Sequence, residues 1–222
     1  MKVIDLSQTN TLINCYMAQL RDKNYQQNRT LFRQNLKRIG QAMAYELSKT
    51  LEYSEKSVQT PLGTKMVPTY DDHIVVGTVL RAGLAFQDGF TSVFDGADSA
   101  FVAAYREEGS KEDLKIRLEY MAAPHLDGST FLLVDPMLAT GGSLELAYKA
   151  LLNAGCPKKL HICVVIAARE GVHHLEECFP EDNVTLWTAA IDEELNEAAY
   201  IVPGLGDAGD LSFGPKLSTK EQ

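Results

Sequence analysis

The residues best suited to bind or transform a ligand lie in a short segment that runs from an apolar stretch into a glycine pair. Val134 is followed by Asp135, and Gly141 and Gly142 then precede Ser143 at the start of a helical pattern. Open backbone N–H groups beside the glycines, hydroxyl groups and the positive end of a new helix bind a phosphate monoester without any lysine. A carboxylate at the end of the preceding strand is suited to accept hydrogen bonds from ribose hydroxyls. The segment therefore predicts a site for a phosphorylated sugar.

A plainer interpretation of this segment stays open at this point. Asp135 can cap a turn, and the Thr140–Ser143 run can be no more than the start of a helix. A Walker-type nucleotide loop is excluded, because no Gly-Lys-Ser or Gly-Lys-Thr follows the glycines.

A second glycine-rich string lies close to the carboxyl end of the sequence. Gly204, Gly206 and Gly209 match the spacing of a dinucleotide-binding loop, but the string follows Pro203 and opens no strand–helix–strand unit. Glycine-rich backbone instead offers flat peptide donors and acceptors to a small planar base. The alternative is a flexible tail with turns, which the low polarity around Ile201–Leu205 disfavours.

The elements that must position these loops follow from hydrophobic patterning. Apolar residues spaced three or four apart, and helix-like composition, predict helices over Arg29–Tyr53, Ser143–Asn153 and Gly171–Cys178. Continuous apolar, β-branched runs, typical of strands covered on both faces of a parallel sheet, predict strands over Ile74–Leu80, Phe101–Ala104, Thr130–Val134, Leu160–Ala168 and Val184–Ala189. A hairpin is predicted over Val58–Thr69. Alternating strands and helices predict an α/β domain in which a buried strand ends at Asp135.

Composition narrows the class of protein. The 222 residues carry a net charge of −9 at pH 7, which disfavours a general nucleic-acid binder. The longest apolar run, Ile162–Ala168, is far too short to cross a membrane. The first ten residues lack a secretory signal and the four cysteines form no Cys-x-x-Cys pair, so we expect a cytoplasmic protein without disulfides. His173 and His174 diverge by about 100° on a helix and make a poor pair of metal ligands.

Several of these blocks together resemble one family. The segment Asp135-Pro-Met-Leu-Ala-Thr-Gly-Gly-Ser143 is similar to the ribose-5-phosphate loop of type I phosphoribosyltransferases. Pro136 stands where most sister families have a second acidic residue, as in the uracil phosphoribosyltransferase family. The resemblance covers most of the chain, from about Arg29 to Gly214. Its other blocks are Val79–Leu84, Tyr105–Arg106, Ile191–Glu197 and Tyr200–Asp210.

The resemblance implies a fold and a reaction. The fold is that of type I phosphoribosyltransferases, a mostly parallel central sheet flanked by helices, with an N-terminal helix and β-hairpin arm and a C-terminal base-binding hood. It implies one phosphoribosyltransferase domain over 1–222, divided into an N-terminal appendage over about 1–70, a core over about 71–190 and the hood over about 191–214. The reaction converts uracil and 5-phospho-α-D-ribose 1-diphosphate (PRPP) to UMP and diphosphate in pyrimidine salvage.

The resemblance also implies site residues. Ligands of PRPP are expected at Arg81, Arg106, Asp135, Pro136, Met137, Leu138, Ala139, Thr140, Gly141, Gly142, Ser143 and Asp207. Ligands of uracil are expected at Ile201, Gly206, Asp207 and Ala208. Arginine suits the diphosphate because its planar guanidinium binds two oxygens at once, although an isolated Arg81 after a strand would usually be a solvated surface residue. Catalysis is expected from positioning and from stabilising the leaving group, so no side chain is assigned as acid or base.

Cofactor and partners follow from the same resemblance. Mg²⁺ is expected to arrive with PRPP and to have no direct protein ligand. The Glu107–Lys115 loop, next to Arg106, is a candidate lid that excludes water. Some family members respond to GTP, and members form dimers or larger assemblies, so we expect a homodimer or homotetramer in contact through the N-terminal helix and the hairpin. Neither a nucleic acid nor a membrane is expected as a partner.

The sequence departs from the family pattern at three positions. Thr78 and Arg169 each stand where the family usually has proline, and Leu211 replaces a common arginine or lysine. Two other functions remain as alternatives: a pyrimidine-sensing regulator that binds RNA, and a catalytically silent homologue. The acidic pI near 5.0 disfavours the first, and the intact glycine-rich loops disfavour the second.

Overall fold

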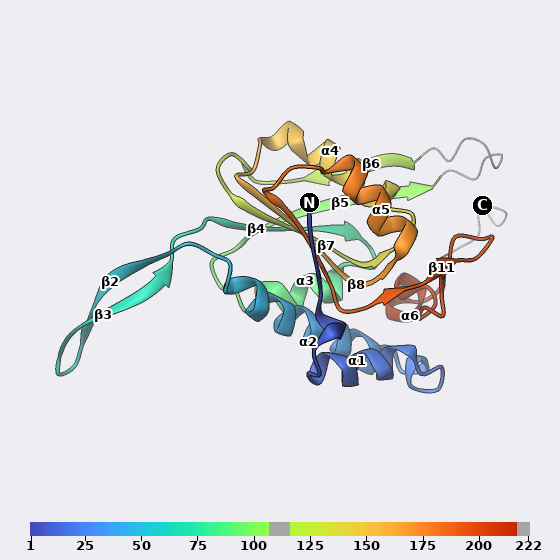
Figure 1. Ribbon diagram of the computed structural model, residues 1–222, viewed down its shortest axis with the longest axis horizontal. Helices are drawn as coiled ribbons and strands as arrows, with labels where there is room; N and C mark the ends of the chain where they lie inside the picture. Colours follow the sequence, from blue (N-terminus) through green and yellow to red (C-terminus); the bar gives the residue numbers. More distant parts are fainter. Residues whose placement is uncertain (107–115, 217–222) are drawn as a thin grey trace.

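An eight-stranded sheet runs through the centre of the computed structural model, which describes residues 1–106 and 116–216 (Figure 1). Its strand order is β1-β9-β8-β7-β4-β5-β6, with β10 added beside β8. The pairs are parallel apart from β6, which lies antiparallel to β5. The strands are β1 (Lys2–Asp5), β4 (Ile74–Leu80), β5 (Asp98–Arg106), β6 (Ile116–Ala122), β7 (Thr130–Leu138), β8 (Lys159–Ala168), β9 (Val184–Thr188) and β10 (Ile191–Asp192).

Helices cover both faces of this sheet, as the continuous apolar strands require. One face carries α1 (Leu12–Arg21), α2 (Arg29–Ser48) and α3 (Leu84–Thr91), and the other carries α4 (Gly142–Leu151) and α5 (Arg169–Cys178) (Figure 1). Successive residues of β7 alternate between two cores: Leu132 and Val134 pack with α1–α3, whereas Phe131 and Leu133 pack with α4 and α5. The mostly parallel α/β fold predicted from the sequence is therefore confirmed.

The hairpin is also present, and it is longer than predicted. Its strands β2 (Tyr53–Thr60) and β3 (Gly63–Tyr70) pair antiparallel along their whole length and extend well beyond the sheet (Figure 1). Most of their residues are exposed, and the side chain of Leu62 at the tip is fully so. The arm therefore contributes little to the core of this chain.

Two of the boundaries that differ from the prediction have a clear physical cause. The helix predicted to reach Tyr53 ends at Ser48, where the N–H of Lys49 bonds to both Glu46 and Leu47 carbonyls and tightens the last turn. The strand predicted to end at Asp135 continues to Leu138, because pairing with β8 resumes at Met137 after Pro136, which has no N–H to donate.

Shorter elements that hydrophobic patterning did not reveal complete the molecule. Among them are the edge strands β1 and β6 and the helices α1 and α3. Near the carboxyl end lie β11 (Glu194–Leu195), β12 (Ile201–Val202) and α6 (Ala208–Phe213). No helix in the described part of the chain is long and apolar enough to cross a membrane.

His161 in β8 gives the fold a pH-dependent stability. Its ring is buried, Nδ1 accepts a hydrogen bond from Trp187 Nε1 (3.1 Å), and burial lowers the pKa of His161 to about 4. The folded chain keeps the ring neutral, whereas the unfolded chain protonates it near pH 6.5, so its contribution is complete above that pH and is lost as the pH falls towards 4. His161→Gln keeps an acceptor for Trp187 but cannot be protonated. We therefore expect its unfolding free energy to fall less on acidification than that of the wild-type chain, by on the order of 2 kcal/mol.

Urea unfolding of both proteins at pH 7 and pH 4.5 measures this difference. Equal pH dependence of the unfolding free energy in the two proteins would contradict a neutral buried imidazole. His125→Gln is the matched control, since His125 is exposed and its replacement should leave the pH dependence unchanged.

Candidate active site

Three segments meet beyond the carboxyl ends of the parallel strands, on the side of the molecule where α6 and β11 lie (Figure 1). Arg81 follows β4, the Asp135–Ser143 segment runs from the last residues of β7 into the first turn of α4, and the Ile201–Ala208 segment runs from β12 to the start of α6. Arg81 also contacts α6 directly, because its Nη2 donates to Asp210 Oδ1 (3.1 Å). This edge is where open α/β sheets bind ligands, so the topology gathers the residues singled out by the sequence.

The start of α4 has the backbone geometry of an anion site. Gly141 precedes the helix with φ +88°, a conformation that favours glycine, and no side chain caps the first turn. The N–H groups at the start of α4 are thus left for a ligand, with the helix dipole pointing its positive end at the same place. The ring of His174 on α5 packs against the loop from behind: a Cβ on Gly141 would lie 2.6 Å from His174 Cδ2.

Gly141→Ala should therefore disrupt the loop by two routes, backbone strain and collision with His174. We expect a loss of about 1–3 kcal/mol in unfolding free energy and a rise of at least about tenfold in the Kd of a phosphorylated ligand. Calorimetric titration and thermal unfolding measure the two effects. Gly96→Ala is the matched control, since nothing lies within 4 Å of its Cβ position. An unchanged ligand Kd in Gly141→Ala would remove this loop from the site.

Asp135 lies inside this edge, partly buried, with the N–H of Met137 donating to its Oδ1 (3.2 Å). Burial raises the pKa of Asp135 to about 7, and the negative charge of Asp207 adds to the rise. The negative charges of these two carboxylates therefore oppose each other in one region. Such an arrangement favours a ligand that brings cations or hydrogen-bond donors to these oxygens.

Contacts with Asp210 in α6 and with Gly214 hold the partly exposed guanidinium of Arg81 in place. Its Nη2 donates to Asp210 Oδ1 and to the carbonyl of Gly214, both at 3.1 Å. An anionic ligand at this position has to compete with the carboxylate of Asp210 for the guanidinium. The other predicted arginine, Arg106, ends β5, and its side chain lies outside the described residues, as does the predicted lid over 107–115.

The glycine-rich string is ordered backbone rather than a flexible tail. Ile201 in β12 pairs with Leu195 in β11, and its side chain is buried, so only its backbone can face a ligand. Gly206 is exposed with φ +89°, and Asp207 caps α6 by accepting from the N–H of Asp210 (2.9 Å). The segment thus presents peptide groups at its exposed surface.

Comparison with known proteins identifies the family. The family model described as uracil phosphoribosyltransferase matches residues 7–215. The chain belongs to the uracil phosphoribosyltransferase family. Curated members include the uracil phosphoribosyltransferases of Porphyromonas gingivalis, 46% identical over 98% of this chain and all of that protein, and of Limosilactobacillus fermentum, 39% identical over 92% of this chain and 95% of that protein. The solved AQ2163 protein from Aquifex aeolicus is 34% identical with a TM-score of 0.85, covering 97% of this chain and all of that one.

The three departures from the family pattern each have a local structural role. Thr78 donates from Oγ1 to the carbonyl of Val134 (3.1 Å), which ties β4 to β7 next to Asp135. Arg169 forms a bidentate pair with Glu193 (2.7 and 2.9 Å) at the exposed start of α5. Leu211 packs in place of a charge, and its Cδ1 lies 3.5 Å from the Cβ position of Gly206.

Sequence reasoning missed the residues that hold the glycine-rich string in place. The guanidinium of Arg21 on α1 makes two hydrogen bonds to Asp192 (2.6 and 2.7 Å) and one to the carbonyl of Gly204 (3.0 Å). Asp192 also accepts from the N–H of Gly204 (2.8 Å). Gln26 Nε2 donates to the carbonyl of Leu205 (2.7 Å). No local pattern reveals the contacts of Arg21 and Gln26, because 171 to 183 residues separate these side chains from their partners.

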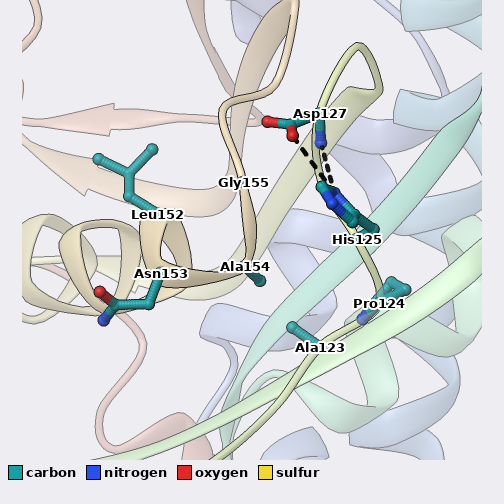
Figure 2. Close-up of a pocket in the computed structure, with 8 residues that line it drawn as sticks. All are labelled: Ala123, Pro124, His125, Asp127, Leu152, Asn153, Ala154 and Gly155. Atoms are coloured by element: carbon teal, nitrogen blue, oxygen red, sulfur yellow. Dashed lines mark hydrogen bonds and ion pairs between the residues drawn. The ribbon is translucent and has the colours of Figure 1, made fainter.

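A shallow hollow of about 520 Å³ lies elsewhere, near the amino-terminal ends of β7 and β8 (Figure 2). Its lining comes from the segment before β7 and the turn after α4, as Ala123, Pro124, His125, Asp127, Leu152, Asn153, Ala154 and Gly155. The ion pair drawn there, between His125 and Asp127 (3.5 Å), joins two largely exposed side chains of the same segment. It shares no residue with the family's motifs, so we place the active site at the opposite edge of the sheet.

Proposed function

We propose that this chain is a pentosyltransferase that moves the 5-phosphoribosyl group of PRPP onto uracil, releasing diphosphate and forming UMP. The observation that carries the proposal is the uncapped start of α4 behind Gly141, which faces the same edge as Asp135, Arg81 and the exposed Gly206–Asp207 backbone. Membership in the uracil phosphoribosyltransferase family supports the choice of base.

Each segment takes one part of the substrates in this proposal. The 5-phosphate binds the N–H groups and hydroxyls of Ala139–Ser143, and Asp135 accepts hydrogen bonds from the ribose hydroxyls. The diphosphate replaces Asp210 as the hydrogen-bond partner of the Arg81 guanidinium, and Arg106 supplies a second guanidinium. Backbone groups at Ile201, Gly206 and Ala208 form hydrogen bonds with the carbonyl and N–H groups of uracil. Because uracil is neutral, such hydrogen bonds suit it better than a charged side chain does.

The chemical step breaks the bond from ribose C1 to the diphosphate oxygen and forms the bond from C1 to uracil N1. The electron pair of the broken bond leaves with the diphosphate, and the N1 proton is released to the leaving group or to water. Positive charge grows on the sugar while negative charge grows on the diphosphate beside Arg81, so positioning and leaving-group stabilisation lower the barrier. No side chain of this chain is assigned as the acid or base.

Mg²⁺ fits this site as an ion that enters bound to PRPP. The carboxylates of Asp135 and Asp207 supply hard oxygen donors near one another, and burial together with the negative charge of Asp207 raises the pKa of Asp135, so a cation here would favour its ionised form. When bound, the ion would neutralise diphosphate charge and orient the ribose hydroxyls. These two residues would face it through its water ligands, without binding it directly.

The division of the chain and its assembly belong to the same proposal. We assign residues of about 1–70 to an appendage, about 71–190 to the catalytic core and about 191–214 to the hood. The exposed apolar side chains of the arm, Tyr53, Val58, Leu62 and Met66, would be covered in a homodimer or homotetramer. Light scattering after chromatography tests the assembly, with Leu62→Glu expected to weaken it. Adding GTP to the assay tests activation.

A UMP-formation assay with uracil, PRPP and Mg²⁺ tests the function. The wild-type chain should form UMP, whereas Arg81→Ala should lose at least about a hundredfold in kcat/KM, because the leaving group loses a charged partner. Arg38→Ala is the matched control and should keep activity, since Arg38 lies in the middle of α2 and donates to Asn35 of the same helix. No UMP from the wild-type chain would reject the function, and full activity in Arg81→Ala would reject this residue's role.

A further inference from the structure

Three side chains with metal-binding chemistry meet at the junction of α4 and α5, outside the substrate site. They are Glu145 from α4 and His174 and Cys178 from α5, and their donor atoms all lie within 4.8 Å of one another. His174 Nε2 lies 2.8 Å from Glu145 Oε2 and 3.5 Å from Cys178 Sγ. All three residues are partly exposed, so an ion can reach them from solvent.

The local sequence explains why this trio forms although the adjacent histidine pair cannot. His174 and Cys178 are four residues apart on α5 and therefore share one face of the helix. Glu145 lies in the first turn of α4, which packs against that face. His173 points elsewhere: its side chain is 81% exposed and lies 3.6 Å from Glu176 on its own helix.

The donor set selects the class of ion. A carboxylate oxygen, an imidazole nitrogen and a thiolate sulfur together suit a borderline ion such as Zn²⁺, whereas Mg²⁺ and Ca²⁺ prefer oxygen ligands alone. In a tetrahedral zinc site, bond lengths of about 2.0–2.3 Å place neighbouring donors roughly 3.3–3.7 Å apart. The distance from Cys178 to His174 already has this value, and the distance from His174 to Glu145 needs to open by less than about 1 Å.

We propose that Glu145, His174 and Cys178 form a binding site for one zinc-like divalent ion, with water as the fourth ligand. Binding replaces the contacts of Glu145 with Lys149 and His174 and the thiol proton of Cys178, which is released to solvent. The ion crosslinks α4 to α5 through side chains. Because the His174 ring packs against Gly141, the same crosslink holds the loop at the start of α4.

Cobalt titration of the reduced, EDTA-treated protein tests the site, with Co²⁺ as a spectroscopic probe for Zn²⁺. The wild-type chain should bind one equivalent with a thiolate-to-cobalt charge-transfer band and the visible bands of a tetrahedral ion, and Zn²⁺ should displace both. Cys178→Ser should remove the charge-transfer band, and His174→Gln should weaken Co²⁺ binding by at least about tenfold. Saturating Zn²⁺ should raise the thermal midpoint of the wild-type chain by about 5 °C or more.

Two matched controls separate this site from adventitious binding. His173→Gln changes the neighbouring histidine, and Cys156→Ser removes an exposed cysteine outside the trio. Both should keep the wild-type spectrum, affinity and thermal shift. The proposal is overturned if the wild-type chain shows no thiolate band, if Cys178→Ser retains that band, or if His173→Gln weakens binding as much as His174→Gln. The readouts need no substrate, so they stand apart from the proposed transferase activity.

Discussion

Asp135→Asn is expected to abolish transferase activity while making the protein without substrate more stable. The carboxyl of Asp135 is partly buried, and its pKa of about 7 means that the fold disfavours its charge. An amide of the same shape removes that cost and can still accept from the N–H of Met137. The amide is a weaker acceptor for the ribose hydroxyls than a carboxylate is, and it cannot balance the charge of a cation. We expect kcat/KM for PRPP to fall by about a hundredfold or more.

The sign of the stability effect follows from the two pKa values. Asp135 ionises near 3.8 in the unfolded chain and near 7 in the folded chain, so its ionisation destabilises the fold progressively as the pH rises between those values. The gain in unfolding free energy from Asp135→Asn should be small at pH 4 and reach on the order of 2 kcal/mol above pH 7, after allowance for partial exposure.

Urea unfolding at pH 4, 6 and 8 measures this gain, and calorimetric titration with Mg²⁺–PRPP measures binding over the same range. Wild-type affinity should weaken as the pH falls below 7, because PRPP requires the ionised form, and Asp135→Asn should lose that part of the dependence. The ionisation of PRPP itself is common to both proteins. Asp182→Asn, an exposed carboxylate, is the control. A variant that is both active and less stable would contradict this account of Asp135.

The parts of this site that could be predicted from sequence are those coded locally. The Asp135–Ser143 segment and the glycine-rich string are each recognised by residue types within about ten positions, and strand–helix alternation places them at one edge of the sheet, whereas Arg81 was singled out only through the family resemblance. Asp135 was also singled out, although Pro136 made the strand appear to stop three residues early.

What the sequence did not reveal depends on contacts between distant segments. The edge strands β1 and β6 become strands because β9 and β5 offer them a partner, and their own patterns are too short to show it. The trio of Glu145, His174 and Cys178 could not be predicted for a similar reason. In the sequence His174 stands next to His173, and only the packing of α4 on α5 brings Glu145 close to it. The tether between Arg21 and Asp192 is the most distant of these relationships.

Arg21→Ala is expected to raise the KM for uracil by about tenfold or more while changing the KM for PRPP by less than about threefold. Asp192 is 6% exposed, and the hydrogen bonds from Arg21 and from the N–H of Gly204 hold the pKa of Asp192 below its ordinary value against the opposing effect of burial. Removing the guanidinium leaves a buried carboxylate without its charged partner, which costs about 3–5 kcal/mol unless the loop rearranges. The Gly204–Gly206 backbone is the part free to rearrange, and it is the surface we assign to the base.

A general loss of stability predicts a different pattern, which makes the test selective. Steady-state kinetics at saturating concentrations of the other substrate should place the defect in uracil binding, and Arg21→Lys should restore part of it by returning a positive charge without the bidentate geometry. Arg169→Ala is the matched control, because it breaks the adjacent ion pair between Arg169 and Glu193, whose two side chains are 62% and 73% exposed. Loss of this exposed pair should leave both KM values unchanged. Equal rises in both KM values for Arg21→Ala would show that the tether supports the fold as a whole. A selective rise would make an N-terminal helix part of how the base is chosen, although no residue of that helix lies in the family's substrate motifs.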